Sequence, residues 1–210
     1  MTYTFFRLIP LGICLPVMFL GCKQDYLKPT DYVHYVKDTD NGFIERRDTM
    51  DVLLEAFYQP PEYFSLIHME PGKIDQSLLA TDIARNSNFY HFNLKIASAS
   101  GKPIDEILKN IVTNDDEPFD TKKQHMLYNM QNYFFLATGK DSLPCTFYHA
   151  QLTGKIDNAY HFALAFEADS ASQKQSDVLR LIYTDSIWLQ SKFDFAFNKI
   201  KINQSPGLKL

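Results

Sequence analysis

The segment Phe89-Tyr90-His91-Phe92-Asn93-Leu94-Lys95-Ile96-Ala97 carries the clearest structural signal in this chain of 210 residues. Large apolar side chains alternate in it with polar ones. The apolar positions are Tyr90, Phe92, Leu94 and Ile96, and the polar positions are His91, Asn93 and Lys95. Successive side chains of a β-strand point to opposite faces, so the pattern predicts a strand with one apolar and one polar face.

The same period of two residues predicts further strands elsewhere in the chain. They cover residues 50–58, 129–138, 178–184 and 187–198. Pro60 and Pro61 end the first of these strands, because proline cannot donate a hydrogen bond to a sheet. A helical period of 3.6 residues is clearest at 103–112, where a proline and two acidic residues mark the first turn. Further short helices are predicted near residues 74–84 and 120–127.

These elements predict a mainly β (α+β) fold. We expect about seven antiparallel strands, arranged as a β-sandwich or a curved sheet, with two or three short helices. The composition agrees, because 17 Phe and 12 Tyr with only 8 Gly suit packed sheets better than glycine-rich phosphate-binding loops. No internal repeat or low-complexity segment interrupts the pattern, so residues 31–210 are expected to form a single β-rich domain.

A β-hairpin is predicted where Leu143–Leu152 and Asn158–Glu167 flank a short Gly-Lys segment. Gly154 suits the first central position of a two-residue type II′ turn, which pairs Thr153 with Ile156. This register places Phe147 opposite Phe162 and Cys145 opposite Leu164 on one apolar face.

Two site hypotheses depend on that register. His149 and His161 would lie on opposite faces of the hairpin, so we expect no shared metal, because zinc needs three or four converging ligands. Cys145 would lie on the buried face, where a thiol behaves as a small apolar group rather than as a nucleophile.

Residues 1–21 have the features of a secretory signal peptide. Arg7 precedes an apolar run from Leu8 to Leu20, and a small residue, Gly21, follows it. Pro10 and Pro16 interrupt the run. A helix that spans a bilayer needs about 20 apolar residues, so this run is too short to be a good transmembrane segment.

The tetrapeptide Phe19-Leu20-Gly21-Cys22 resembles the lipobox of bacterial lipoproteins, which carry a type II signal peptide. Gly21 and Cys22 fit the family pattern, whereas Phe19 and Leu20 depart from it. The resemblance implies that residues 1–21 are removed, that Cys22 is diacylated with chains such as palmitate, and that residues 22–30 form a lipidated tether. The alternative is an ordinary cleaved signal peptide in which Cys22 has no role.

Lys23, Gln24 and Asp25 resemble the export signal of surface lipoproteins from Bacteroidota, although that pattern prefers two acidic residues after the lysine. The whole chain is also similar to uncharacterised lipoproteins of that group, in part through Pro61-Glu62-Tyr63. The resemblance implies a lipid-anchored protein of the outer membrane that faces the periplasm or the cell surface. It implies no activity.

The net charge bears on the kind of partner, and the cysteine content bears on disulfide formation. Removal of 21 of the 210 residues leaves 189, and the loss of Arg7 changes the net charge from −4 to −5. A mildly acidic chain without a basic cluster argues against nucleic acid as a partner. After lipidation of Cys22, Cys145 is the only cysteine left, so no intramolecular disulfide can form.

Motifs of catalysis are absent from the sequence. It contains no Gly-x-Ser-x-Gly, His-Glu-x-x-His, Walker loop, Gly-x-Gly-x-x-Gly or Cys-x-x-Cys. We therefore predict no catalytic, cofactor-binding or metal-binding residue, and Cys22 is the one predicted site. The first functional hypothesis is a non-catalytic binding or assembly module with an envelope protein partner. The alternatives are a small envelope hydrolase and a hydrophobic-ligand carrier, which would need an apolar cavity between the sheets.

Overall fold

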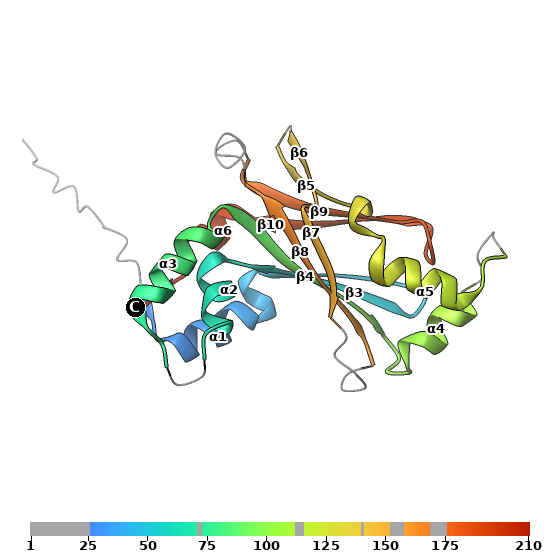
Figure 1. Ribbon diagram of the computed structural model, residues 1–210, viewed down its shortest axis with the longest axis horizontal. Coiled ribbons are helices and arrows are strands. Elements are labelled where there is room, and N and C mark those ends of the chain that lie inside the picture. The colour runs from blue at the N-terminus through green and yellow to red at the C-terminus, as the bar shows by residue number, and fades with distance from the viewer. Residues whose placement is uncertain (1–25, 71–72, 112–115, 140, 152–157, 169–175) are drawn as a thin grey trace, which may run out of the picture.

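A computed structural model describes residues 26–70, 73–111, 116–139, 141–151, 158–168 and 176–210 (Figure 1). These residues contain 40% strand and 33% helix, in antiparallel sheets that remain open. The mainly β fold class predicted from the alternating pattern is therefore confirmed. The described residues hold six α-helices rather than the expected two or three, since several short helices lie at the ends of the sheets.

The larger sheet has five antiparallel strands in the order β2-β3-β4-β8-β7. Its strands are β2 (Ile44–Thr49), β3 (Val52–Gln59), β4 (Phe89–Ser98), β7 (Phe147–Gln151) and β8 (Tyr160–Glu167). The central strand β4 pairs with β3 on one side and β8 on the other. The segment whose alternation is clearest therefore lies at the centre of the larger sheet.

The smaller sheet has four antiparallel strands in the order β10-β9-β5-β6. They are β5 (Phe134–Thr138), β6 (Asp141–Pro144), β9 (Val178–Asp185) and β10 (Ser191–Asn198). A separate parallel pair joins β1 (Tyr26–Leu27) to β11 (Gly207–Leu208), and so holds the first described residues beside the end of the chain.

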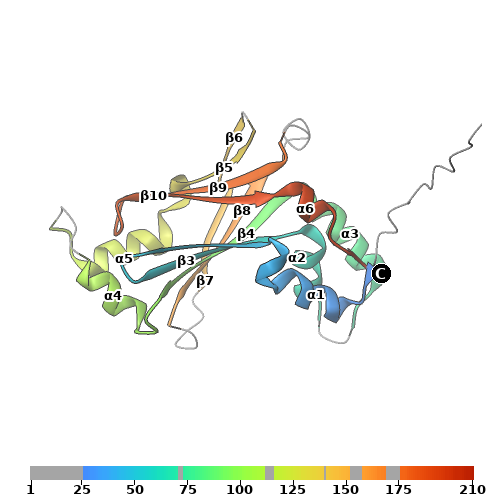
Figure 2. The same cartoon turned by 180° about the vertical axis from the view of Figure 1, so that it is seen from behind.

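The helices gather at the two ends of the sheets (Figures 1 and 2). One end holds α1 (Pro29–Lys37), α2 (Pro61–Ile67), α3 (Gln76–Asn86) and α6 (Lys199–Asn203), and the other holds α4 (Ile104–Asn110) and α5 (Phe119–Tyr128). Single 3-10 turns occur at Thr39–Asn41 and Gln131–Tyr133. In the part of the chain that the structure describes, no helix combines the length and apolarity needed to cross a bilayer.

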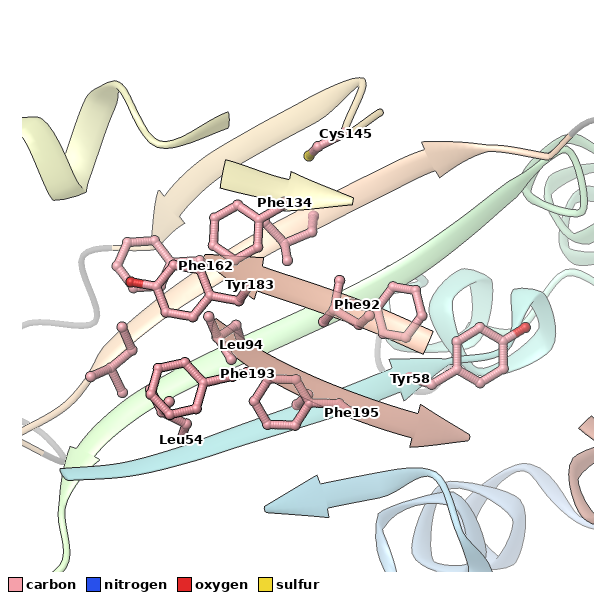
Figure 3. Close-up of a cluster of buried hydrophobic side chains, with 14 of the residues drawn as sticks. Leu54, Tyr58, Phe92, Leu94, Phe134, Cys145, Phe162, Tyr183, Phe193 and Phe195 are labelled. Atoms are coloured by element: carbon pink, nitrogen blue, oxygen red, sulfur yellow. The ribbon is translucent and has the colours of Figure 1, made fainter. Parts of the chain in front are cut away.

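The core forms where the inner faces of the two sheets meet. Side chains from both sheets point toward one another there, including Phe92, Phe134 and Tyr183 (Figure 3). Phe134 stacks on Tyr183 within the smaller sheet, with ring centroids 4.8 Å apart, and Phe92 lies 5.4 Å from Phe197 across the interface. Such aromatic pairs add about 0.5–1.5 kcal/mol each beyond the area that they bury.

The alternation of β4 is confirmed by burial. Tyr90, Phe92, Leu94 and Ile96 are all buried against the smaller sheet. The side chains that alternate with them, including those of Asn93 and Lys95, lie on the outer face of the larger sheet. His91 belongs to that outer face and is nevertheless 8% exposed, because α2 packs over this part of the sheet.

The predicted hairpin register is wrong. Phe147 pairs with Ala165 rather than Phe162, and Ala150 pairs with Phe162. This register turns Tyr148 and Ala150 inward with Phe162, and it turns Phe147 to the outer face. Burial of Tyr148 beside the inner residues of β8 thus outweighs the preference for a two-residue turn. The turn at 153–156 lies outside the described residues.

The expected single strand from Leu143 to Leu152 is also divided between the sheets. β6 pairs with β5 in the smaller sheet, and β7 pairs with β8 in the larger one. Pro144, which has no N–H to donate, precedes the corner, and the Thr146 N–H donates to the Ala165 carbonyl at 2.9 Å. The chain therefore connects the two sheets along this edge.

The opposite edge is bridged by a side chain. Arg47 on β2 donates to the main-chain carbonyl of Asp194 on β10 at 2.6 Å, and its guanidinium lies 5.4 Å from the Phe195 ring. The sandwich is thus held at both long edges, which keeps the two inner faces in contact.

Residues 187–198 also depart from the prediction, because only Ser191–Asn198 form a strand. The segment before it is a buried loop around Asp185, with Trp188 only 4% exposed. After Asn198 the chain forms helix α6. The Asn198 carboxamide accepts from the Lys201 N–H at 3.1 Å, and this cap starts the helix.

Candidate functional site

A pocket of about 570 Å³ lies on the outer face of the larger sheet, beside α2 and α3. Its volume is within the range of about 300–1,000 Å³ typical of small-molecule sites. The lining comprises Gln59, Phe64, Ile67, His68, Arg85, Asn86, Phe89, His91, Phe92, Asn93, Phe147, His149, Gln151, Ala163, Leu164 and Ala165. Half of these residues are apolar, and the polar half consists of carboxamides and imidazoles apart from Arg85.

The strand register explains the shape of this pocket. Ala163 and Ala165 on β8 face outward between the larger side chains of β4 and β7, so the outer surface of the sheet is recessed at β8. Phe147 on β7 pairs with Ala165 and stands at one side of this floor. Because Phe147 is 52% exposed, the pocket opens to solvent beside an apolar ring.

Two short helices form the other wall, and local sequence signals set where they start. Pro61 occupies the first turn of α2, where a missing N–H costs nothing, so the prolines that end β3 also start this helix. The Asp75 carboxylate caps α3 by accepting from the N–H groups of Ser77 and Leu78 at 2.8 and 3.1 Å. α2 then presents Phe64 to the pocket, and α3 presents Arg85.

His91 is the most unusual polar residue of this wall. Its ring stacks on Phe64 with centroids 3.8 Å apart and planes 11° apart. Its Nε2 atom is buried and has no hydrogen-bond partner among the described residues. Burial, with a smaller contribution from nearby His68, lowers the pKa of His91 to about 4. The imidazole is therefore neutral at physiological pH.

Several other polar groups of the lining are held by hydrogen bonds. Asn93 Nδ2 donates to Gln151 Oε1 at 3.1 Å, and its Oδ1 lies 3.3 Å from His161 Nδ1. Asn86 Nδ2 donates to Ser65 Oγ at 2.8 Å. These bonds cross from one element to another, so they fix the orientation of the carboxamides before any ligand arrives.

The arrangement can bind a small molecule by stacking and by neutral hydrogen bonds. Phe64, Phe89 and Phe147 supply ring surfaces, and the carboxamides and imidazoles supply donors and acceptors. Among the described lining residues there is no carboxylate, hydroxyl or thiol, so we derive no reaction for this pocket.

The structure corrects the placement of His149 and His161. Both lie on the outer face of the larger sheet, on neighbouring strands, because His161 pairs with Gln151 and not with Tyr148, as the predicted register required. The expectation that they lie on opposite faces is wrong, and the shifted register is the reason. Within the described ranges, no three His, Cys, Asp or Glu side chains lie close enough together to hold a metal ion.

A second cluster joins α4, α5 and β8. Lys123 Nζ donates to Asp105 Oδ2 at 2.8 Å, and the Tyr160 hydroxyl donates to Asp105 Oδ1. Burial alone would raise the pKa of Asp105, but the bonds from Lys123 and Tyr160 outweigh it and lower that pKa. Burial and the Asp105 carboxylate raise the pKa of Tyr160 to about 12. All three groups keep their usual charge states, so the cluster attaches the helices to the sheet.

Two cysteines, Cys22 and Cys145, remain after the expected processing. Cys145 is 6% exposed, and burial raises the pKa of its thiol to about 11. The prediction that Cys145 is a core residue is confirmed. Cys22, the predicted lipidation site, lies outside the described residues and stays a prediction.

Sequence reasoning missed the pocket, although part of its signal was present. The alternating pattern of β4 already placed the polar residues His91 and Asn93 on one face. Pro60 and Pro61 were interpreted only as the end of a strand, so the helix that covers this face was not expected. The outward position of Phe147 was hidden by the wrong hairpin register.

The fold and the pocket define a two-sheet β protein with a ligand-sized site on an outer sheet face. No protein-family model, no curated protein and no solved structure matches this chain.

The pKa of His91 leads to a prediction about stability. The unfolded chain takes up a proton on this histidine near pH 6.5, whereas the folded protein does so only near pH 4. The free energy of unfolding should therefore fall as the pH drops through this window, by about 3 kcal/mol at its lower end. Replacement His91→Phe should remove this part of the pH dependence, as measured by urea unfolding at several pH values between 4 and 7.

The matched control is His34→Phe, at an exposed position of α1. This variant should keep the pH dependence of the wild-type protein, because it leaves His91 and its surroundings unchanged. A His91→Phe variant whose stability still falls as steeply as that of the wild type would contradict the assignment of a buried neutral imidazole.

Proposed function

We propose that this protein is a non-catalytic binding module of the bacterial cell envelope, anchored to the outer membrane through acylated Cys22. Its binding site is the pocket beneath α2 and α3. The observation that carries the binding role is the site itself: a preformed hollow of about 570 Å³ with aromatic walls and oriented carboxamides. Sites of this volume and composition bury most of the surface of a small ligand.

The anchor is supported by sequence alone. Gly21 and Cys22 follow an apolar run that is too short to be a good transmembrane helix, so a lipid on the cysteine would supply membrane attachment. A domain tethered in this way needs no partner to stay at the membrane. An envelope protein could bind the same domain, and the domain would face the periplasm or the cell surface.

The two alternative functions have less support from the geometry. A hydrophobic-ligand carrier would need an apolar cavity between the sheets. Packed aromatic side chains such as Phe92 and Phe197 meet there instead, and the pocket lies on an outer face. A small envelope hydrolase would need a reacting group, and the described lining offers imidazoles without a neighbouring carboxylate or nucleophile.

The pocket can be tested with N-phenyl-1-naphthylamine, an uncharged fluorescent probe whose emission rises in apolar surroundings. We expect saturable binding to the wild-type protein. Replacement Ala163→Phe places a ring on the floor of the pocket, so it should weaken binding at least about tenfold, a loss of about 1.4 kcal/mol. A fluorescence titration measures both affinities.

The control is Ala196→Phe, the same change on the outer face of the smaller sheet, where Ala196 pairs with Arg180. This variant should bind the probe as the wild type does. Equal binding by all three proteins, or no saturable binding at all, would overturn the proposed site.

A further inference from the structure

We infer that the pocket selects uncharged, ring-bearing ligands, that is, small amphiphiles with a flat apolar face and neutral hydrogen-bonding groups. This inference rests on the proposed binding function and names the ligand class of the same site. It follows from three features of the lining: its formal charges, its buried imidazole and its ring surfaces.

The charges of the site cancel. Arg85 is the one formally charged side chain among the described lining residues, and its Nη2 atom lies 3.0 Å from Asp82 Oδ1 on the same helix. A buried anion would therefore meet a cation that already has a partner. A buried cation would meet no carboxylate in the described lining.

Burying an unpaired charge is costly, because the ligand loses its hydration and gains no opposite charge. Neutral polar groups lose less, and here they meet carboxamides that are already oriented. Asn93 and Asn86 are fixed by bonds to Gln151 and Ser65 and retain hydrogen-bonding capacity for a ligand. The electrostatics of the pocket thus favour neutral ligands over either kind of ion.

His91 adds a second, independent observation. A polar side chain that is 8% exposed normally satisfies its hydrogen bonds within the protein, but Nε2 of His91 has no partner among the described residues. An unpartnered N–H is rarer in proteins than an unpartnered acceptor, so we assign the ring proton to Nδ1. Nε2 of the neutral ring then offers the ligand an acceptor, and it does so without a charge.

The shape of the wall selects flat groups. His91 and Phe64 stack nearly parallel, and the His68 ring lies 4.5 Å from Phe64, so three rings pack against one another in this wall. Phe147 stands across the low floor of Ala163 and Ala165. A planar ring can contact these aromatic faces over a large area with little loss of conformational entropy.

A matched pair of probes tests the selection by charge. N-phenyl-1-naphthylamine is neutral, and 1-anilinonaphthalene-8-sulfonate carries the same ring system with one negative charge. At pH 7.5 we expect the neutral probe to bind at least about tenfold more tightly to the site that Ala163→Phe blocks. Fluorescence titration of each probe, with competition between them, gives the two affinities.

A charge variant sharpens the test. Asp82→Asn removes the partner of Arg85, so it should raise the affinity for the sulfonated probe severalfold and leave the affinity for the neutral probe unchanged. Asp48→Asn, at an exposed position of β2, changes the net charge equally and should alter neither affinity.

The outcomes separate the two proposals. Binding of both probes that depends on Ala163, with equal or tighter affinity for the sulfonate, would overturn the selection for neutral ligands and keep the binding site. An Asp82→Asn variant with the wild-type preference would show that Arg85 does not set it, and would also overturn the argument. Loss of any Ala163-dependent binding would remove the proposed function itself.

Discussion

We expect a Cys22→Ser variant, expressed in a bacterial host grown with radioactive palmitate, to incorporate no label, whereas the wild-type protein is labelled. The cysteine thiol is the acceptor of the acyl group in the lipoprotein pathway that the lipobox resemblance implies, and a serine hydroxyl does not replace it. Buried acyl chains contribute about 0.8 kcal/mol per methylene, so the variant should also move from the membrane fraction to the soluble fraction.

Cys14→Ser is the control for this experiment, because it removes a cysteine from the same signal segment without touching the lipobox. It should be labelled as strongly as the wild type. Equal label in the wild type and Cys22→Ser would remove the lipid anchor from the proposed function. The proposed binding site would then belong to a protein without a lipid anchor.

Replacement Asp185→Ala is expected to lower the free energy of unfolding by about 4 kcal/mol. Asp185 is 3% exposed and ends strand β9. Its carboxylate accepts three main-chain hydrogen bonds, from Ile187 at 2.8 Å, Trp188 at 3.0 Å and Leu189 at 3.1 Å. All three donors lie in a buried loop, so alanine would leave their N–H groups without partners.

The measurement can follow both the loop and the whole fold. Trp188 is the only tryptophan of the chain and lies in this loop, so its fluorescence reports local loosening by a shift to longer wavelength. Urea unfolding followed by circular dichroism reports the sheets. Asp185→Asn, which keeps one carbonyl acceptor, should lose about half as much stability.

Asp48→Ala, at an exposed position of β2, is the matched control and should change stability by less than about 0.5 kcal/mol. An Asp185→Ala variant as stable as this control would show that water replaces the carboxylate without cost. The buried loop would then not depend on its aspartate.

Local patterns were sufficient for much of the fold. The alternation at Tyr90, Phe92 and Leu94 identified the central strand and its buried face, because the two-residue period of a strand is a property of the backbone itself. The burial of Cys145 was also foreseen. Pro103 and the acidic residues after it located helix α4 in the same way.

Pairing between distant segments was not readable from local patterns. The hairpin argument chose a register from a turn preference, which is worth little beside the burial of Tyr148 and Ala150 against the core. The actual register moved Phe147 and His149 to the outer face and created one side of the pocket. The other side needed α2, whose start at Pro61 looked like the end of a strand.

The amino-acid sequence by itself determined the two-sided strands, the mainly β class and the expectation of a lipidated Cys22, because each depends on residues that are neighbours in the chain. Only the tertiary structure decided the pocket. Phe64, His91 and Phe147 come from three separate elements, and they meet because α2 packs over β4 while Ala163 and Ala165 leave room between the strands. A site of this kind depends on packing across long sequence separations, which no local period encodes.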